Sequence, residues 1–212
     1  MRSGRPDRAA ELEDGGVLVQ PYRVAQGQNG FMMIEVLITM FVLLIGLLGV
    51  VGLQARAQQA ENDSYQRSQA LMILRDMVDR INANRKNAAA YITGTSGTNV
   101  MGTGTGKYCS APSTTADIDL CAWSASLVGA TESIGGTCNV STGQNCAGSM
   151  IDARGCITNP ATDVYLIQVV WQGLSPTDAP PASVACGSGS YGAEEQRRAV
   201  TSVVQIGNLA AP

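Results

Sequence analysis

Residues 31–53 read FMMIEVLITMFVLLIGLLGVVGL, and this is the only stretch of the chain that is apolar and long enough to cross a lipid bilayer. Its last 18 residues, 36–53, carry no charge. Twenty-three residues of α-helix extend roughly 35 Å, which exceeds the ~30 Å hydrocarbon core of a membrane. The sequence therefore predicts one membrane-spanning helix near the N-terminus.

Glu35 is the acidic residue inside this apolar run, four positions after its first residue. A charge at the centre of a bilayer costs about 2.5–3.5 kcal/mol, and less near the interface. Either the carboxylate extends to the headgroups, or something else must compensate for its charge. The polar segment 26–30 directly precedes the run, so the boundary between polar and apolar sequence lies between Gly30 and Phe31.

The Gly30–Phe31 junction, followed by Glu35, resembles the precursor signature of type IV pilins and type II secretion pseudopilins. The resemblance implies that a membrane aspartyl peptidase cuts between Gly30 and Phe31 on the cytoplasmic face, and that Phe31 is then N-methylated. It also implies that Glu35 helps a subunit to dock into a filament, because it can neutralise the freed ammonium of a neighbouring subunit. An uncleaved membrane anchor is the alternative.

Three further sequence segments resemble one branch of this superfamily, the PilV minor pilins, also called type IV pilus modification proteins. They are IGLLGVVGLQ at 45–54, RDM at 75–77 and RINANR at 80–85. These segments cover about the first third of the mature chain. The resemblance implies an α+β type IV pilin fold: a long N-terminal helix, with a membrane half and an amphipathic half, packed on a small antiparallel sheet with disulfide-stapled loops.

The expected domain plan follows from this fold. Residues 1–30 form a leader that is removed, 31–53 the transmembrane half of the helix, 54–86 its amphipathic periplasmic half, and 87–212 a globular α+β head. The leader holds four arginines and four acidic residues, whereas leaders in this family are usually shorter and net basic. Either this leader is unusual or translation starts nearer Arg23.

The segment 54–85 contains no proline or glycine, which favours a continuing helix. Its apolar residues at Leu71, Leu74, Val78 and Ile81 recur at spacings of three, four and three, so they share one helix face. We expect this face to pack on the sheet.

The six cysteines all follow the membrane segment, and an even number in an exported domain predicts disulfides in an oxidising periplasm. Free buried thiols are the alternative. Six cysteines allow 15 pairings. The preferred pairing joins neighbours along the chain: Cys109 with Cys121, Cys138 with Cys146, and Cys156 with Cys186.

The sequence of the first half of the head predicts few helices or strands. Residues 93–106 are rich in Gly and Thr and indicate a loop. Residues 117–128 predict a short helix with Asp117 as its N-cap and with Trp123 in the core. Its expected apolar face consists of Ile118, Cys121, Ala125 and Val128. Residues 129–160 predict loops with one or two short strands.

The second half of the head contains the two clearest strands, at 164–172 and 197–206, which we expect to pair antiparallel. In the first strand Tyr165, Ile167, Val169 and Trp171 share one face. Arg197 and Arg198 must point to opposite faces of the second strand, so they indicate solvated or edge-protecting charges rather than a binding site.

Composition argues against several functions. The chain has no histidine, no C-x-x-C and no G-x-S-x-G motif, so we expect neither an enzyme, nor a metal site, nor a cofactor. A net charge of −3 and a pI near 4.9 argue against direct nucleic-acid binding.

The resemblance instead implies a minor pilin that supports pilus assembly, and with it twitching motility, adhesion or DNA uptake. Its partners would be other minor pilins, the major pilin, the prepilin peptidase/N-methyltransferase and the inner-membrane assembly platform. It would cross the bacterial inner membrane once with its head in the periplasm, and then join the fibre at or near the tip. A type II secretion minor pseudopilin and a membrane-anchored tip adhesin are the alternatives.

Overall fold

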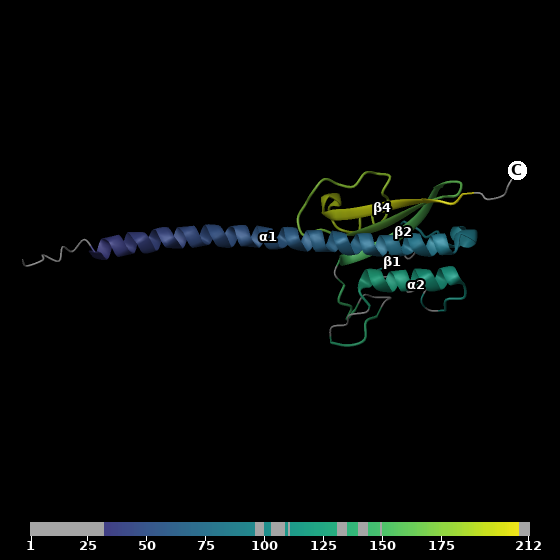
Figure 1. The fold of residues 1–212 in the computed structure, drawn as a ribbon, viewed down its shortest axis with the longest axis horizontal. Helices are drawn as coiled ribbons and strands as arrows, with labels where there is room; N and C mark the ends of the chain where they lie inside the picture. The colour runs from purple at the N-terminus through teal and green to yellow at the C-terminus, as the bar shows by residue number, and fades with distance from the viewer. Residues whose placement is uncertain are drawn as a thin grey trace, which may run out of the picture. The chain divides into compact units, whose positions relative to one another are not determined.

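The computed structural model describes residues 32–95, 100–102, 109, 111–130, 135–139, 144–148 and 150–207. The chain divides into two units between Gly49 and Val50. The elements follow one another in the order α1 (Met32–Ala83), the 3-10 helix η1 (Arg85–Tyr91), β1 (Met101–Gly102), α2 (Thr115–Val128), β2 (Ile151–Ala161), β3 (Val164–Gln172), the 3-10 helix η3 (Glu194–Gln196) and β4 (Arg197–Gln205) (Figure 1).

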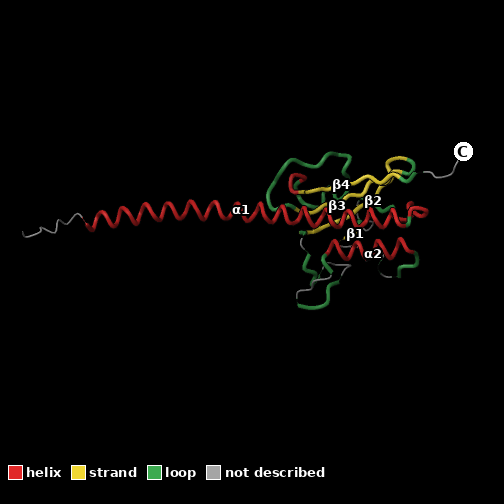
Figure 2. The backbone as a smooth tube through the Cα atoms, viewed as in Figure 1, coloured by secondary structure: helices red, strands yellow, loops and turns green. Residues whose placement is uncertain are grey.

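The predicted fold class is confirmed. A long N-terminal helix with an apolar first half precedes a four-stranded antiparallel sheet, and three disulfides link the head. The strand order is β1-β2-β3-β4, so each strand pairs with its neighbours in sequence. Figure 2 shows the strands together with the long loop that connects β3 to β4.

The second half of α1 buries one face against the sheet, but that face differs in part from the predicted one. Its buried apolar residues are Ala70, Leu74, Met77 and Ile81, at spacings of four, three and four. Leu71 is 36% exposed and Val78 is partly buried, so these two lie on a flank. The prediction counted branched apolar residues and omitted Ala70 and Met77, which shifted the face.

The pairing of β3 with β4 is confirmed. All nine residues of β3 pair with β4 without a bulge, from Val164 opposite Gln205 to Gln172 opposite Arg197. The second strand ends one residue earlier than predicted. On the core side of β3, the alternating residues Tyr165, Ile167, Val169 and Trp171 are all buried, as expected.

The strand β2 is longer than the short strands predicted for residues 129–160. It runs for 11 residues and pairs with β3, with register shifts between Ile151 and Arg154 and between Thr158 and Ala161. Asp152 has a φ of 49°, which an ordinary strand residue does not adopt. These irregularities disrupt the alternation of apolar and polar residues by which a strand is recognised from sequence.

Part of the predicted loop at 93–106 is ordered against this strand. Met101 pairs with Gly155, and Gly102 pairs with Arg154. Thr93 donates its backbone N–H to the carbonyl oxygen of Ile157, and its hydroxyl accepts from the N–H of Ile157. Residues 96–99 and 103–106 of the predicted loop lie outside the described residues.

The helix α2 begins earlier than predicted. Its N-cap is Thr114, whose hydroxyl accepts from the N–H of Asp117, while the Asp117 carboxylate accepts from the N–H of Thr114. Asp117 is therefore the second partner of a capping box and not the cap itself. These hydrogen bonds, above all those to Thr114, lower the pKa of Asp117.

The buried face of α2 is also different from the expected one. Leu120, Trp123 and Leu127 are at most 1% exposed, whereas Ile118 is 56% exposed. Cys121 and Ala125 are half-buried, and Val128 is buried. Trp123 lies in the core, as predicted, and Figure 1 shows α2 running alongside the second half of α1.

Candidate functional site: the apolar part of α1 and the stapled head

The first described turn of α1 contains Glu35. The N-terminal end of a helix carries a partial positive charge, which stabilises a nearby carboxylate. Glu35 is exposed, so its carboxylate is accessible from outside the chain. Gly30 and Phe31, the residues of the expected cleavage site, lie outside the described residues.

The apolar part of α1 exposes its side chains all around the helix. Every large apolar side chain from Met33 to Leu53 is between 49% and 79% exposed. Within the described residues, α1 is the one helix that is long and apolar enough to cross a bilayer, by length and composition, with a mean hydropathy of 2.9 in its most apolar window. A helix that is apolar on every side requires lipid or neighbouring helices around it.

A polar cluster joins α1 to α2 at the far end of the helix. The Arg80 guanidinium donates to Asp76 and to Asp119, each at 2.9 Å. The Tyr91 hydroxyl donates to the other oxygen of Asp119 and accepts from the Asn84 amide at 3.2 Å. The two carboxylates, with that of Asp76 first, raise the pKa of Arg80.

Burial, together with the Asp119 carboxylate, raises the pKa of Tyr91 to about 12. The phenol is therefore a neutral hydrogen-bond donor at any physiological pH. Asp119 accepts both this hydroxyl and the Arg80 guanidinium, so it links the end of α1, η1 and α2. This cluster therefore holds three elements in place.

The residues of this polar cluster come largely from the segments that resemble the PilV minor pilins. Asp76 and Arg80 come from those segments, and Asp119 and Trp123 follow 34 or more residues later. The structure brings them together, because Arg80 pairs with Asp119 while the Trp123 indole donates to the Ile73 carbonyl at 3.1 Å. Sequence reasoning did not identify Tyr91, which no spacing pattern connects to Asp119.

The head contains three disulfides, and they join the cysteine pairs that the sequence analysis preferred: Cys109 with Cys121, Cys138 with Cys146, and Cys156 with Cys186. The first pair ties α2 to the segment before it. The third links β2 to the loop between β3 and β4. Both sulfur-bearing residues of this third pair are completely buried.

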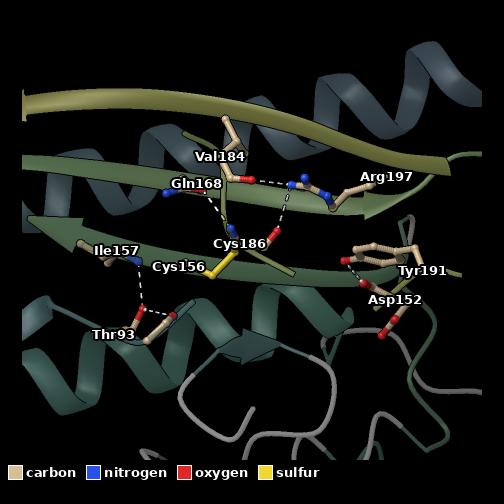
Figure 3. Close-up of a disulfide and its surroundings, with 10 residues drawn as sticks. Thr93, Asp152, Cys156, Ile157, Gln168, Val184, Cys186, Tyr191 and Arg197 are labelled. Carbon is tan, nitrogen blue, oxygen red and sulfur yellow. Dashed lines mark hydrogen bonds between the residues drawn. A yellow bond between two sulfur atoms is a disulfide. The ribbon is translucent and has the colours of Figure 1, made fainter. Parts of the chain in front are cut away.

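Polar side chains form hydrogen bonds with the loop backbone next to the Cys156–Cys186 disulfide (Figure 3). The backbone N–H of Cys186 donates to the side-chain oxygen of Gln168 at 3.2 Å. The Arg197 guanidinium donates to the carbonyl oxygens of Val184 and Cys186, at 2.7 and 3.2 Å. Gln168 and Arg197 therefore satisfy loop backbone groups that the disulfide has drawn away from water.

The expectation that Arg197 and Arg198 are solvated or edge-protecting charges is wrong for Arg197, whereas Arg198 is only half-buried. Arg197 is 3% exposed and forms a salt bridge of 2.6 Å with Glu194. Arg198 donates to the carbonyl oxygens of Ser175 and Glu195. The loop between β3 and β4 is rich in glycine and proline and leaves backbone carbonyls without sheet partners. Both arginines hold the loop in place by donating to such carbonyls.

The same loop is fixed at a further point. The Tyr191 hydroxyl donates to the Asp152 carbonyl at 2.9 Å, and the Arg154 guanidinium lies 5.7 Å from the centre of the Tyr191 ring. Burial and the nearby Asp152 raise the pKa of Tyr191. The loop surface is thus held by a disulfide, a buried arginine and a buried tyrosine.

Among the described residues, no group of three or more cysteine, aspartate or glutamate side chains is arranged to hold a metal ion. A cavity of about 320 Å³ lies between α1 and the start of β4. Its lining residues are Asp63, Ser64, Arg67, Trp171, Arg198 and Ala199.

The long apolar helix, the antiparallel sheet and the stapled loops together define a type IV pilin-like α+β architecture. Residues 52–125 match the family model described as type IV pilin Tt1218. The match extends from the middle of α1 through most of α2, and it supports a type IV pilin family and a pilin role for this chain. No curated protein matches the chain. No solved structure matches it.

Proposed function

We propose that this chain is a minor pilin of the PilV kind, which is cleaved between Gly30 and Phe31, N-methylated at Phe31 and incorporated into a type IV pilus. The observation that carries the proposal is the apolar part of α1, whose large side chains from Met33 to Leu53 are exposed on every side while Glu35 lies in its first described turn. Such a helix is stable in a membrane or among other helices, but not in water.

Glu35 then has a specific task. Cleavage before Phe31 creates a new ammonium, and a neighbouring subunit's Glu35 can pair with it where water is excluded and charge pairing is strong. A lone carboxylate in hydrocarbon is costly, so pairing favours the assembled fibre over the single subunit. In this proposal the inner membrane holds the subunit, with its head in the periplasm, until the assembly platform adds it to the fibre.

The test compares Glu35→Ala with Glu61→Ala in the full-length chain. Glu61 is an exposed acid on the same helix, so its variant controls for the loss of one charge. We expect Glu35→Ala to remain in the membrane but to fall at least fivefold in sheared pili, and Glu61→Ala to match the wild type. Equal incorporation of Glu35→Ala contradicts the proposal.

Two further experiments separate the neighbouring functions. Mass spectrometry of the mature protein should find methylated Phe31 at its N-terminus, and Gly30→Ala should retain residues 1–30. Gene deletion should remove pili and leave exoprotein secretion intact. Loss of secretion with normal pili indicates a type II pseudopilin instead, and loss of adhesion with normal pili indicates a tip adhesin.

A further inference from the structure

The cavity between α1 and the start of β4 is lined mainly by polar and charged side chains. Its volume is about 320 Å³, and small-molecule sites in proteins begin at roughly 300 Å³. The helix α1 supplies one wall, and the paired strands β3 and β4 supply the other. All of the lining residues belong to the unit 50–212, so the cavity does not depend on the placement of residues 1–49.

Trp171 brings a buried hydrogen-bond donor to this cavity. Its side chain lies on the core side of β3, and the residue is 3% exposed. Its indole N–H has no acceptor among the described residues, whereas that of Trp123 donates to the Ile73 carbonyl. A buried donor without an acceptor is destabilising. An acceptor oxygen that enters the cavity and reaches this N–H removes that cost.

Asp63 and Arg67 bring one negative and one positive charge from the same face of α1. They are four residues apart, a spacing at which an acid and an arginine can pair on a helix. In the part of the chain that the structure describes, however, Arg67 forms no salt bridge. The Oδ1 oxygen of Asp63 is buried there without a hydrogen-bond partner, and so is the side-chain oxygen of Gln66. This face of α1 therefore presents acceptors that need a donor and a cation that needs an anion.

Arg198 has a different role, because its N–H groups are already in use. Its guanidinium donates to the carbonyl oxygens of Ser175 and Glu195 and to the Thr177 hydroxyl. These acceptors are neutral, so they leave its positive charge uncompensated. Arg198 therefore forms a fixed wall of the cavity and adds to the attraction that Arg67 exerts on an anionic group.

The unpaired groups restrict the chemistry of a ligand. An anion alone would leave the buried oxygen of Asp63 without a donor and would bring a second negative charge close to it. An amine alone would leave the Trp171 N–H and Arg67 without an acceptor. Water can bridge such groups, but it neutralises neither Asp63 nor Arg67. A small molecule that carries a carboxylate and an ammonium next to each other satisfies all three.

We propose that this cavity binds a free α-amino acid. Its carboxylate accepts from the Trp171 indole N–H and from the Arg67 guanidinium, which suits a carboxylate because of its planar fork of donors. Its ammonium donates to the Asp63 carboxylate. The two charged ends of a polypeptide are far apart in sequence, so this pairing selects a free amino acid over a peptide. Binding of this kind is separate from pilus assembly and does not require it.

The principal test follows the two indole N–H resonances of the full-length chain by NMR, with Trp171→Phe to assign them. The probes are L-alanine, propanoate, which lacks the ammonium, and ethylamine, which lacks the carboxylate. We expect L-alanine to shift the Trp171 resonance saturably and to leave that of Trp123 unchanged. Propanoate and ethylamine should bind at least tenfold more weakly than L-alanine.

Two pairs of variants test the separate contacts. Asp63→Asn should weaken L-alanine at least tenfold without weakening propanoate, because only the ammonium contact is lost. Arg67→Met should weaken both L-alanine and propanoate. The matched controls are Glu61→Gln and Arg75→Met, which change exposed charges of α1 outside the cavity and should stay within twofold of the wild type.

Several outcomes would overturn the proposal. A Trp171 resonance that does not move at millimolar L-alanine shows that the cavity holds water alone. Propanoate or inorganic phosphate that binds as tightly as L-alanine shows a general anion site. Equal losses of L-alanine and propanoate in a folded Asp63→Asn variant show that Asp63 shapes the cavity without contacting an ammonium. Glu35→Ala does not touch this cavity, so the pilin proposal and the amino-acid site can fail independently.

Discussion

The indole N–H of Trp123 donates a hydrogen bond of 3.1 Å to the backbone carbonyl of Ile73, fifty positions earlier in the chain. The Trp123 ring also lies where a Cβ atom on Gly155 would be. One side chain of α2 therefore contacts both α1 and β2. Since the family match covers part of α1 and most of α2 but ends before β2, this contact connects the matched segment to the sheet.

Gly155→Ala should destabilise the head, because its new methyl group would overlap the rings of Trp123 and the side chain of Leu127. Overpacking of this kind costs about 1–3 kcal/mol of unfolding free energy. Urea unfolding of the purified protein, followed by tryptophan fluorescence, measures the change. Gly207→Ala, where a methyl group meets open space, should stay within about 0.5 kcal/mol of the wild type. Equal stability of the two variants would contradict the packing described.

Asp119→Asn should weaken the polar cluster between α1 and α2 more than Asp76→Asn does. The Asp119 side chain is 15% exposed and accepts from both Arg80 and Tyr91, whereas that of Asp76 is 44% exposed and pairs with Arg80 alone. Loss of a shielded charged acceptor costs about 1–3 kcal/mol, and loss of an exposed ion pair less than about 1 kcal/mol. The same unfolding measurement should therefore rank the variants in this order; the reverse ranking would exclude Asp119 as the link.

The raised pKa of Tyr91 predicts a loss of stability at alkaline pH. The ordinary value of 10 applies to the unfolded chain, and burial beside Asp119 raises the folded value to about 12. The folded state therefore holds the Tyr91 proton more tightly than the unfolded chain does. The resulting contribution to the free energy of unfolding is complete below pH 10 and is lost as the pH rises from 10 towards 12. Tyr91→Phe should flatten this part of the stability profile.

The flattening should be partial, because the pKa of Tyr191 is raised in the same direction. The Tyr91→Phe, Tyr191→Phe double variant should flatten the profile further. Unfolding midpoints collected from pH 9 to pH 12 provide the comparison. A Tyr91→Phe profile that is parallel to the wild type would show that the phenol titrates equally in the folded and unfolded chains.

Much of the fold could be predicted from the sequence, because its strongest signals are local. The uncharged run 36–53, the helix-forming segment after it and the alternation in 164–172 each depend on neighbouring residues. The chain connectivity then favoured antiparallel pairing of β3 with β4. The Glu35 assembly role and the Gly30–Phe31 cleavage came from resemblance, and they remain proposals.

The remaining elements depend on distant partners. Asp152 and the register shifts in β2 interrupt alternation, and β1 has only two residues, so neither strand has a clear periodic signal. Arg197 resembled an edge charge because a strand pattern does not reveal that a distant loop, held by Cys186, will cover it. Tertiary contacts of this kind decide burial without changing local sequence preference.

The three disulfides should contribute unequally to stability. The Cys156→Ala, Cys186→Ala double variant lacks the disulfide whose cysteines lie 30 residues apart, and this loss should lower the free energy of unfolding by about 3–4 kcal/mol. The Cys138–Cys146 link spans 8 residues, and its removal should cost about 2–3 kcal/mol. Limited proteolysis separates the two effects, since only the first variant should become sensitive within residues 174–193. Cleavage there in the second variant would contradict the assignment.

Arg197→Met should release the loop between β3 and β4 even with the disulfide intact. The variant leaves the carbonyl oxygens of Val184 and Cys186 without their donor and removes the salt bridge to Glu194, at a cost of about 2–4 kcal/mol. Arg198→Met, which loses bonds nearer the surface, should cost roughly 1 kcal/mol. Urea unfolding and proteolysis of the loop should both separate the two variants.

Acid should reproduce part of the Arg197→Met effect. The Gly189 backbone N–H and the Arg197 guanidinium lower the pKa of Glu194, so the folded state favours the carboxylate. Its stabilising contribution is present above the ordinary pKa of a glutamate and is lost as the pH falls through the lowered value. Glu194→Gln should therefore lose stability at neutral pH and show a weaker dependence on acid than the wild type. If its profile ran parallel to that of the wild type between pH 5 and pH 3, the stabilisation of the loop by Arg197 would not depend on the charge of Glu194.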